Sequence, residues 1–247
     1  MKAIILAAGQ GTRLRPLTNN KPKCMVSYLD NPIIDTIIKT MKLSRIKDIS
    51  IVAGYKKEVL QKHLLNEKIK FYTNDSFMTT NMVSTLFCAE IEMNDDIIIS
   101  YSDIIYSEKI LNSLIESKDD ISVVVDRSWR ELWQQRMDNP LLDAETLKIK
   151  DNKIIELGKK PKCFSEIEGQ YIGLIKISKK VILDVLSAYT TMDRDKKYDG
   201  KDFDNMYLTS FIQYLINNGF RISPVFINGG WTEIDCLKDL NVSIIEG

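Results

Sequence analysis

The sequence has no excess of charge of either sign and no long apolar run. Its 247 residues carry 34 Lys plus Arg against 34 Asp plus Glu, so the overall charge favours neither nucleic acid nor an acidic membrane surface as a partner. The apolar run at residues 3–8 is too short for a signal-peptide core or a membrane span, and no later segment approaches one. We therefore expect a cytoplasmic protein without a nucleic-acid or membrane partner, in which any recognition of phosphate is local.

Cysteine and histidine are scarce. The four cysteines stand far apart and form no Cys-x-x-Cys pair, which argues against a zinc ribbon or a redox dithiol and favours free thiols in a reducing compartment. The single histidine, His63, has basic and polar neighbours, so we expect it to be solvated on a helix. A reaction that depends on histidine is therefore not expected.

Short apolar strands alternate with helices in the first half of the chain. We expect strands at 3–8, 49–53, 71–73, 96–101 and 121–125, and helices at 31–41, 56–65, 81–92 and 111–117. This alternation predicts an α/β fold, with a single Rossmann-like, mostly parallel (mixed) sheet and helices on both faces. Right-handed crossovers would place the turns after the strands at one edge of the sheet, where ligands bind.

The second half is less regular. We expect a hairpin at 147–157 that turns at Asp151-Asn152, strands at 170–177 and 222–227, helices at 181–189, 206–218 and 235–244, and a charged loop at 193–204. No linker, repeat or low-complexity segment interrupts the chain. The sequence therefore predicts one continuous domain with a small added lobe.

The most informative segment runs from Leu6 to Lys23 and reads LAAGQGTRLRPLTNNKPK. Its small residues allow the backbone to approach a polyphosphate, and successive N–H groups can point at the phosphate oxygens. Arg13 and Lys23 add positive charge. The segment lacks both the third glycine of a dinucleotide-binding turn and the Gly-Lys-Ser/Thr of a P-loop. It therefore predicts a site for a nucleoside triphosphate.

This segment closely resembles the signature of the sugar-phosphate nucleotidyltransferase family. The resemblance implies a Mg²⁺-dependent attack of a substrate phosphate on the α-phosphate of the nucleotide, with release of pyrophosphate. Charge neutralisation and positioning matter most in such a transfer. The family's nucleotide-binding positions carry over to Leu6, Ala7, Ala8, Gly9, Gly11, Thr12, Arg13 and Lys23. Of these, Arg13 and Lys23 would stabilise the charge on the α-phosphate and on pyrophosphate.

Two aspartates match the family's metal ligands. Asp103 follows the strand expected at 96–101, and Asp235 stands near the C-terminus. Either could instead cap a helix or a turn. Taken together, their positions favour ligation of Mg²⁺, because a carboxylate at the carboxyl end of a strand is a common ligand of this ion.

Other segments resemble a narrower branch, the phosphocholine, phosphonate and phosphoramidate (phosphoglutamine-type) cytidylyltransferases. Hexose-1-phosphate enzymes of the family usually have a Gly-Thr-Ala-type segment and a Gly-Asp pair. This chain has NMVSTL at 81–86 and Ser102-Asp103, and its GQYIG at 169–173 and GWTEID at 230–235 also resemble the branch. The branch implies CTP as co-substrate, with Asn81 and Ser84 contacting its base or ribose, although both could simply cap the following helix.

The acceptor pocket is expected in the second half of the chain. Trp129 and Trp133 share one face if their segment is helical, with core packing as the alternative. The resemblance places Trp133, Tyr207 and Glu233 in the aromatic, acidic pocket that holds trimethylammonium in phosphocholine enzymes. Further polar candidates would suit a smaller zwitterionic acceptor or its phosphoryl group; they are Arg136, Asp143, Glu145 and Lys160, with Lys159 or a solvated basic loop as alternatives to Lys160.

The sequence therefore predicts a CTP-dependent cytidylyltransferase for a small phosphorylated or phosphonylated amine or amino acid, as in the synthesis of cell-surface polysaccharide or lipid precursors. Residues 1–125 would form the nucleotide-binding half, and residues 126–247 the acceptor-binding half, of one nucleotidyltransferase domain. The alternatives are a hexose-1-phosphate nucleotidyltransferase that uses UTP or dTTP, and a non-catalytic nucleotide-binding regulatory protein. The acceptor and the oligomeric state, including a homodimer, stay open.

Overall fold

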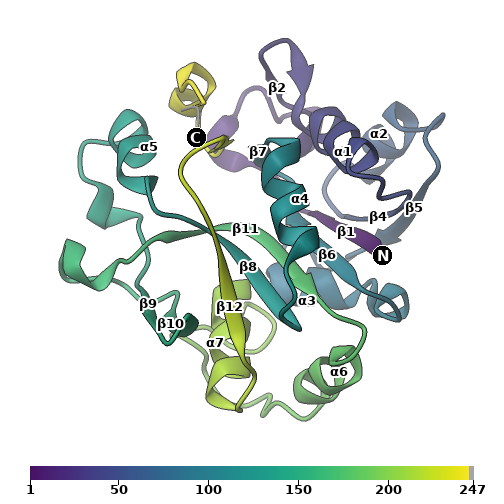
Figure 1. The fold of residues 1–247 in the computed structure, drawn as a ribbon. Helices are drawn as coiled ribbons and strands as arrows, with labels where there is room; N and C mark the ends of the chain where they lie inside the picture. The colour runs from purple at the N-terminus through teal and green to yellow at the C-terminus, as the bar shows by residue number, and fades with distance from the viewer. Residues whose placement is uncertain (245–247) are drawn as a thin grey trace.

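The computed structural model describes residues 1–244, and its centre is a seven-stranded sheet in the order β12-β8-β11-β6-β1-β4-β5 (Figure 1). The strands are β1 (Lys2–Ala7), β4 (Asp48–Ala53), β5 (Ile69–Thr73), β6 (Ile97–Tyr101), β8 (Ile121–Asp126), β11 (Gln170–Ile177) and β12 (Ile222–Ile227). Only β11 is antiparallel to its neighbours in this sheet, β6 and β8. The predicted mostly parallel, mixed sheet is therefore confirmed.

Helices cover both faces of the sheet because the strands are apolar on both sides. Ile5 of β1 and Ile51 of β4 pack with one layer, whereas Ile4 and Val52 pack with the other. The first layer contains α1 (Ile33–Leu43), α2 (Lys57–His63), α4 (Glu108–Glu116) and α5 (Trp129–Arg136). The second contains α3 (Met82–Phe87), α6 (Ile182–Thr190) and α7 (Leu208–Asn217).

Short strand pairs flank the main sheet. The hairpin of β9 (Leu147–Lys150) and β10 (Lys153–Leu157) turns at Asp151 and Asn152, which adopt φ of 49° and 55°, as the sequence predicts. The pair β2 (Ser27–Tyr28) and β3 (Asn31–Pro32) lies before α1. The antiparallel pair of β7 (Ile104–Tyr106) and β13 (Trp231–Glu233) is not predicted from the sequence. It brings the segments around residues 103 and 235 together.

Two predicted helices differ from the structure. The helix expected at 81–92 ends at Phe87 and is followed by a separate 3₁₀ turn, Glu90–Glu92. The helix expected at 235–244 is wrong, because only a 3₁₀ turn forms, at Leu237–Asn241. There the Asp239 carboxylate turns back to accept hydrogen bonds from the backbone amides of Asp235 and Cys236. Such local bonds favour a tight turn over a continuing helix.

Within residues 1–244, none of the helices combines the length and the hydrophobicity that a membrane span requires.

Candidate active site

The turn after β1 encloses a cavity of about 240 Å³. A Cβ atom added to Gly9 would meet no atom within 4 Å, so the backbone there is open on one side. Gly11 adopts φ of 62°, a left-handed conformation that favours glycine. We call this space the turn cavity; its lining includes Leu6, Ala8, Gly9, Gly11, Thr12, Arg13, Lys23, Asn81, Met82, Thr85, Ser102, Asp103 and Asp235.

Lys23 lies at the centre of an ion-pair cluster beside this turn. Its Nζ donates to Asp103 Oδ2 at 2.5 Å and to Asp235 Oδ1 at 2.8 Å. Arg13 pairs with the other oxygen of Asp235. Burial works to lower the pKa of Lys23, but the negative charges of Asp103 and Asp235 outweigh it and hold that pKa above its usual value. Lys23 is therefore a fixed positive charge at the cavity wall.

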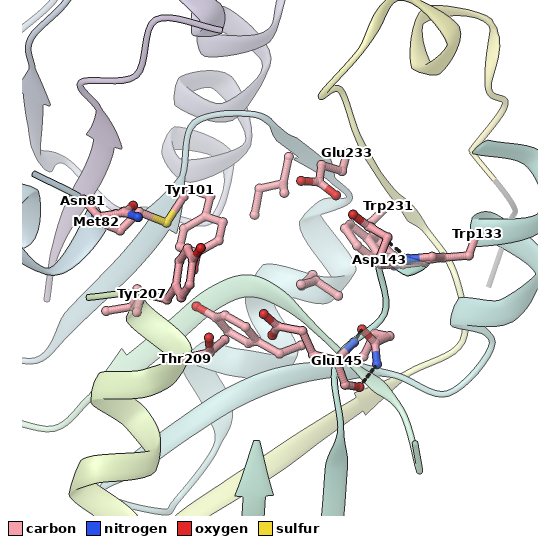
Figure 2. A pocket seen from close by; sticks show the side chains of 15 residues that line it. Asn81, Met82, Tyr101, Trp133, Asp143, Glu145, Tyr207, Thr209, Trp231 and Glu233 are labelled. Carbon is pink, nitrogen blue, oxygen red and sulfur yellow. Dashed lines mark hydrogen bonds between the residues drawn. The ribbon is translucent and has the colours of Figure 1, made fainter. Parts of the chain in front are cut away.

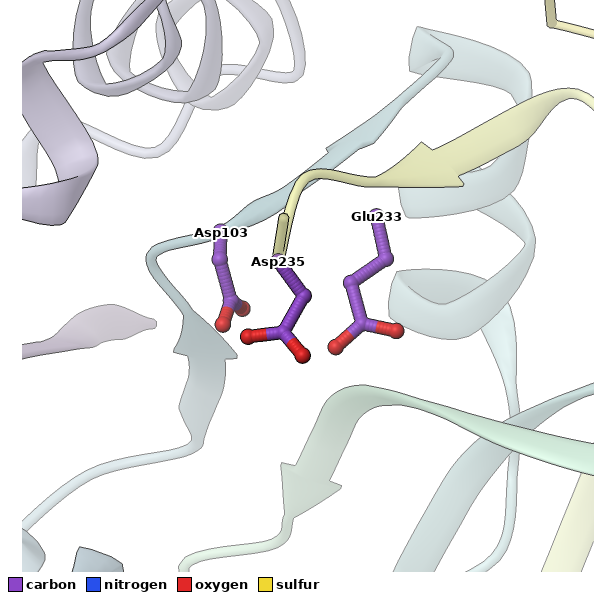
Figure 3. Close-up of side chains that lie close together, drawn as sticks. All are labelled: Asp103, Glu233 and Asp235. Atoms are coloured by element: carbon purple, nitrogen blue, oxygen red, sulfur yellow. The ribbon is translucent and has the colours of Figure 1, made fainter. Parts of the chain in front are cut away.

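Three carboxylates lie side by side at the ends of β6 and β13 (Figure 3). Asp103, Glu233 and Asp235 each offer an oxygen, and these oxygens lie within 4.8 Å of one another. Asp103 Oδ1 is buried and has no hydrogen-bond partner among residues 1–244. Clustered carboxylate oxygens, one of them unpartnered, fit a hard divalent cation. Neither Asp103 nor Asp235 caps a helix, because Asp103 precedes a strand and Cys236 is the cap of the last turn.

A second cavity, of about 260 Å³, opens beside the first (Figure 2). Aromatic rings and carboxylates form most of its wall, and we call it the aromatic cavity. Its lining residues include Tyr101, Trp133, Asp143, Glu145, Gln170, Tyr171, Tyr207, Thr209, Trp231 and Glu233. The side chains of Asp143 and Glu145 enter it from the segment just before β9, and that of Glu233 enters from the end of β13 (Figure 2).

The aromatic cavity is strongly acidic. Its lining within residues 1–244 contains three carboxylates and no lysine or arginine. Trp133 Nε1 donates to Asp143 at 3.1 Å. Burial, together with the nearby charges of Asp143 and Glu233, raises the pKa of Glu145 to about 7. Of the three carboxylates, Glu233 is paired with Arg136 behind the wall, whereas Asp143 and Glu145 have no ion pair with a lysine or arginine of the described lining. Aromatic walls and such carboxylates favour a cationic ligand group over an anionic or neutral one.

The two cavities adjoin. Asn81 and Met82 line both of them. The carboxylate cluster also spans the boundary, since Glu233 faces the aromatic cavity whereas Asp103 and Asp235 face the turn cavity. Ligands in the two spaces would therefore meet beside these three carboxylates.

Most of the site residues expected from the sequence line these cavities, but five do not. Ala7 packs into the core, and Ser84 Oγ donates to the carbonyl of Asp204. Trp129 packs edge-on against Trp133, as in the core-packing alternative. The remaining two, Arg136 and Lys160, bond elsewhere: Arg136 to Glu233 and Asp239, Lys160 to the carbonyl of Leu142. The prediction that these five residues line the site is therefore corrected: none of them lines either described cavity.

Asn81 both caps a helix and lines the cavities, so the two alternatives given for it from the sequence are compatible. Its side chain caps α3 by accepting from the backbone amide of Met82 at 2.8 Å, so the capping alternative is confirmed. It also lines both cavities. Lys159, the alternative to Lys160, pairs with Glu156 at 2.7 Å.

The sequence prediction omits several lining residues. Tyr101, Tyr171, Trp231 and Thr209 all contribute to the aromatic cavity. Three of them stand inside or beside the motifs quoted above, since Tyr101 precedes Ser102-Asp103, Tyr171 lies in GQYIG and Trp231 lies in GWTEID. Aromatic residues adjacent to those motifs were the available signal. Thr209 gives no such signal, because it becomes a wall residue only through the packing of α7.

Comparison with known proteins shows the family of this chain. Residues 2–136 match the nucleotidyl transferase family. The chain is 48% identical to the CTP:phosphoglutamine cytidylyltransferase of Campylobacter jejuni over 99% of both chains. It is also 38% identical to the choline-phosphate cytidylyltransferase of Streptococcus pneumoniae over 47% of this chain and 51% of that protein.

Solved structures share the fold. The CTP:phosphocholine cytidylyltransferase from Streptococcus pneumoniae superposes with a TM-score of 0.73 at 24% identity, over 96% of this chain and 95% of the other. The inositol-1-phosphate CTP transferase from T. maritima gives a TM-score of 0.77 at 20% identity, over 97% and 91%. From the family match and the near full-length similarity, the chain belongs to the nucleotidyl transferase family.

Proposed function

We propose that the chain is a Mg²⁺-dependent cytidylyltransferase that joins CTP to a small phosphorylated or phosphonylated amine or amino acid and releases pyrophosphate. The observation that carries the proposal is the pair of adjoining cavities with a carboxylate cluster at their boundary. The similarity to a CTP:phosphoglutamine cytidylyltransferase supports CTP as co-substrate and favours glutamine phosphate as the acceptor. As parts of the same proposal, the enzyme acts in the cytoplasm, residues 1–125 contribute mainly to nucleotide binding, and residues 126–247 mainly to acceptor binding.

The turn cavity would hold CTP. The open backbone at Gly9 and the turn at Gly11 and Thr12 would face the triphosphate, with Arg13 and Lys23 neutralising its charge. Asp103 and Asp235 would hold Mg²⁺, which when bound supplies charge neutralisation for the phosphates. Asn81, at the end of the cavity nearest the acceptor, would contact the nucleotide.

The aromatic cavity would hold the acceptor, with its ammonium group among the carboxylates of Asp143, Glu145 and Glu233 and its phosphoryl group towards the boundary. An acceptor phosphate oxygen forms the new bond to the α-phosphorus as the bond to pyrophosphate breaks. That oxygen is already ionised near neutral pH, so no general base is required. The chain's contribution is therefore positioning and charge neutralisation.

An assay of pyrophosphate release with CTP tests the proposal. The acceptors are glutamine phosphate, phosphocholine, 2-aminoethylphosphonate and a hexose 1-phosphate, and each is repeated with UTP and dTTP. We expect CTP and an ammonium-bearing acceptor to give the highest kcat/KM. A preference for hexose 1-phosphate with UTP or dTTP would replace the proposed activity by the alternative one. Release with none of the acceptors would favour a non-catalytic nucleotide-binding protein.

Replacing Gly11 by alanine is expected to weaken CTP binding. The new Cβ would lie 2.8 Å from Cβ of Lys23, at a φ of 62° that alanine rarely adopts. The turn and Lys23 must therefore move apart, and we expect KM for CTP to rise by about tenfold. Steady-state kinetics measure it.

The matched control is Gly219→Ala. Gly219 also has a left-handed φ, of 86°, but an added Cβ there meets no atom within 4 Å. This variant has the same kind of backbone strain without the clash, so its melting temperature should fall while KM for CTP stays unchanged. An equal rise of KM in both variants would contradict the predicted role of the turn.

A further inference from the structure

Arg136 is a buried cation that the reaction proposed above does not use. It is the last residue of α5, and its side chain is only 4% exposed. Its guanidinium NH1 donates to Glu233 Oε2 at 2.8 Å, and its Nε donates to Asp239 Oδ1 at 3.0 Å. The group therefore joins two carboxylates that lie on either side of Asp235 in the sequence.

The two carboxylates lead to different parts of the site. Glu233 faces the aromatic cavity. Asp239 is 1% exposed, and its Oδ2 accepts from the backbone amide of Asp235 at 2.7 Å and from that of Cys236 at 2.8 Å. Asp239 thus fixes the backbone that carries Asp235, whose side chain belongs to the carboxylate cluster.

We propose that Arg136 is a positioning residue that sets the acceptor-binding carboxylate of Glu233 and the metal-binding carboxylate of Asp235 in one common geometry. It touches neither substrate and acts through Glu233 on one side and through Asp239 on the other. The proposal rests on the proposed function of the two cavities. A planar guanidinium can direct separate N–H groups at two carboxylates, whereas a lysine ammonium acts as a point charge without this fixed fork.

Arg136→Lys tests this inference, because it keeps the positive charge but removes the planar guanidinium, whose N–H groups point at both carboxylates. We expect KM for the acceptor to rise by about tenfold. We also expect the dissociation constant of Mn²⁺, measured by EPR in the presence of CTP and without acceptor, to rise by about tenfold. The control is Arg130→Lys on the same helix, an exposed arginine that lies over the ring of Phe164. It should change neither quantity.

Asp239→Asn separates the effect of Arg136 on the metal-binding Asp235 from its effect on the acceptor-binding Glu233. This variant alters the support of the Asp235 backbone while the Arg136–Glu233 pair remains, so the Mn²⁺ dissociation constant should rise and KM for the acceptor should change by less than about threefold. It also tests the metal side if Arg136→Lys fails to fold; an unchanged Mn²⁺ affinity in Asp239→Asn would then overturn the inference.

A purely structural role predicts a different result. A folded Arg136→Lys variant with a lower melting temperature, but with acceptor KM or Mn²⁺ affinity unchanged, would overturn the coupling. Failure of the proposed function is distinct, since the unaltered enzyme would then release no pyrophosphate with any acceptor. The Mn²⁺ titration with CTP still shows in that case whether Arg136 and Asp239 support the metal site.

Discussion

Replacing Asp103 by asparagine is expected to lower kcat for pyrophosphate release by about a thousandfold, which corresponds to about 4 kcal/mol of lost transition-state stabilisation. Asparagine has nearly the same shape but removes a negative charge from the carboxylate cluster. The buried Oδ1, which has no partner among residues 1–244, would lose its role as a cation ligand. Steady-state assays across a range of Mg²⁺ concentrations measure the loss, and excess Mg²⁺ should restore only part of it.

The fold should survive this change. The backbone carbonyl of Asp103 still accepts from the amide of Ile234, and Lys23 keeps its ion pair with Asp235. The melting temperature should therefore fall by only a few degrees, about what a loss of 1 kcal/mol gives in a domain of this size. Asp195→Asn, in the exposed loop before α7, is the matched control and should leave kcat unchanged. A folded Asp103→Asn variant with kcat within tenfold of the original enzyme would remove Asp103 from the metal site.

The parts of the fold that follow from local pattern were predicted well. The strand at 170–177 coincides with β11, because a short isoleucine-rich run that is buried almost throughout specifies it locally. By contrast, the pair β7–β13 joins residues more than 120 positions apart. A three-residue strand has too little periodicity to be recognised, and its partner is fixed only by the packing of the whole domain.

The same distinction separates the site residues. Gly9, Gly11, Arg13 and Lys23 belong to one continuous segment, so their shared cavity follows from the sequence motif. Arg136 is predicted at the acceptor because it is one of the polar groups that would suit a small zwitterionic ligand. The position of its side chain depends instead on Asp239, which lies 103 residues away. Charge pattern identifies a candidate residue, but burial decides whether it contacts a ligand or another side chain.

Replacing Glu145 by glutamine is expected to lower kcat/KM for an ammonium-bearing acceptor by about a hundredfold, because the cavity loses a partly buried charge that would pair with the cation. The kcat/KM profile reports groups of the free enzyme. With the pKa of Glu145 at about 7, kcat/KM of the original enzyme should fall as the pH drops below 7 and the carboxylate becomes protonated. In Glu145→Gln the part of the pH dependence that comes from this carboxylate should vanish. The contributions of the acceptor phosphate and of Glu233, whose pKa burial raises to about 7, should remain.

Glu145→Gln should lower kcat/KM for the acceptor but raise the stability of the folded protein above neutral pH. Burial, followed by the charges of Asp143, Glu233 and Asp199, raises the pKa of Glu145 above its usual value of 4.5, against a smaller opposing effect of the hydrogen bond with Thr209. The folded state therefore binds the proton more tightly, so this group's contribution to stability is present below pH 4.5 and is lost as the pH rises through 7. Glu145→Gln should consequently melt at a higher temperature than the original protein at pH 8, and at the same temperature at pH 4.5.

Glu131→Gln, on the exposed side of α5, is the control and should change neither the melting temperature nor kcat/KM. Equal melting temperatures of Glu145→Gln and the original protein at pH 8 would show that ionisation of Glu145 does not destabilise the folded protein. A Glu145→Gln variant that is more stable but less active would show that the charge of Glu145 serves acceptor binding at a cost in stability.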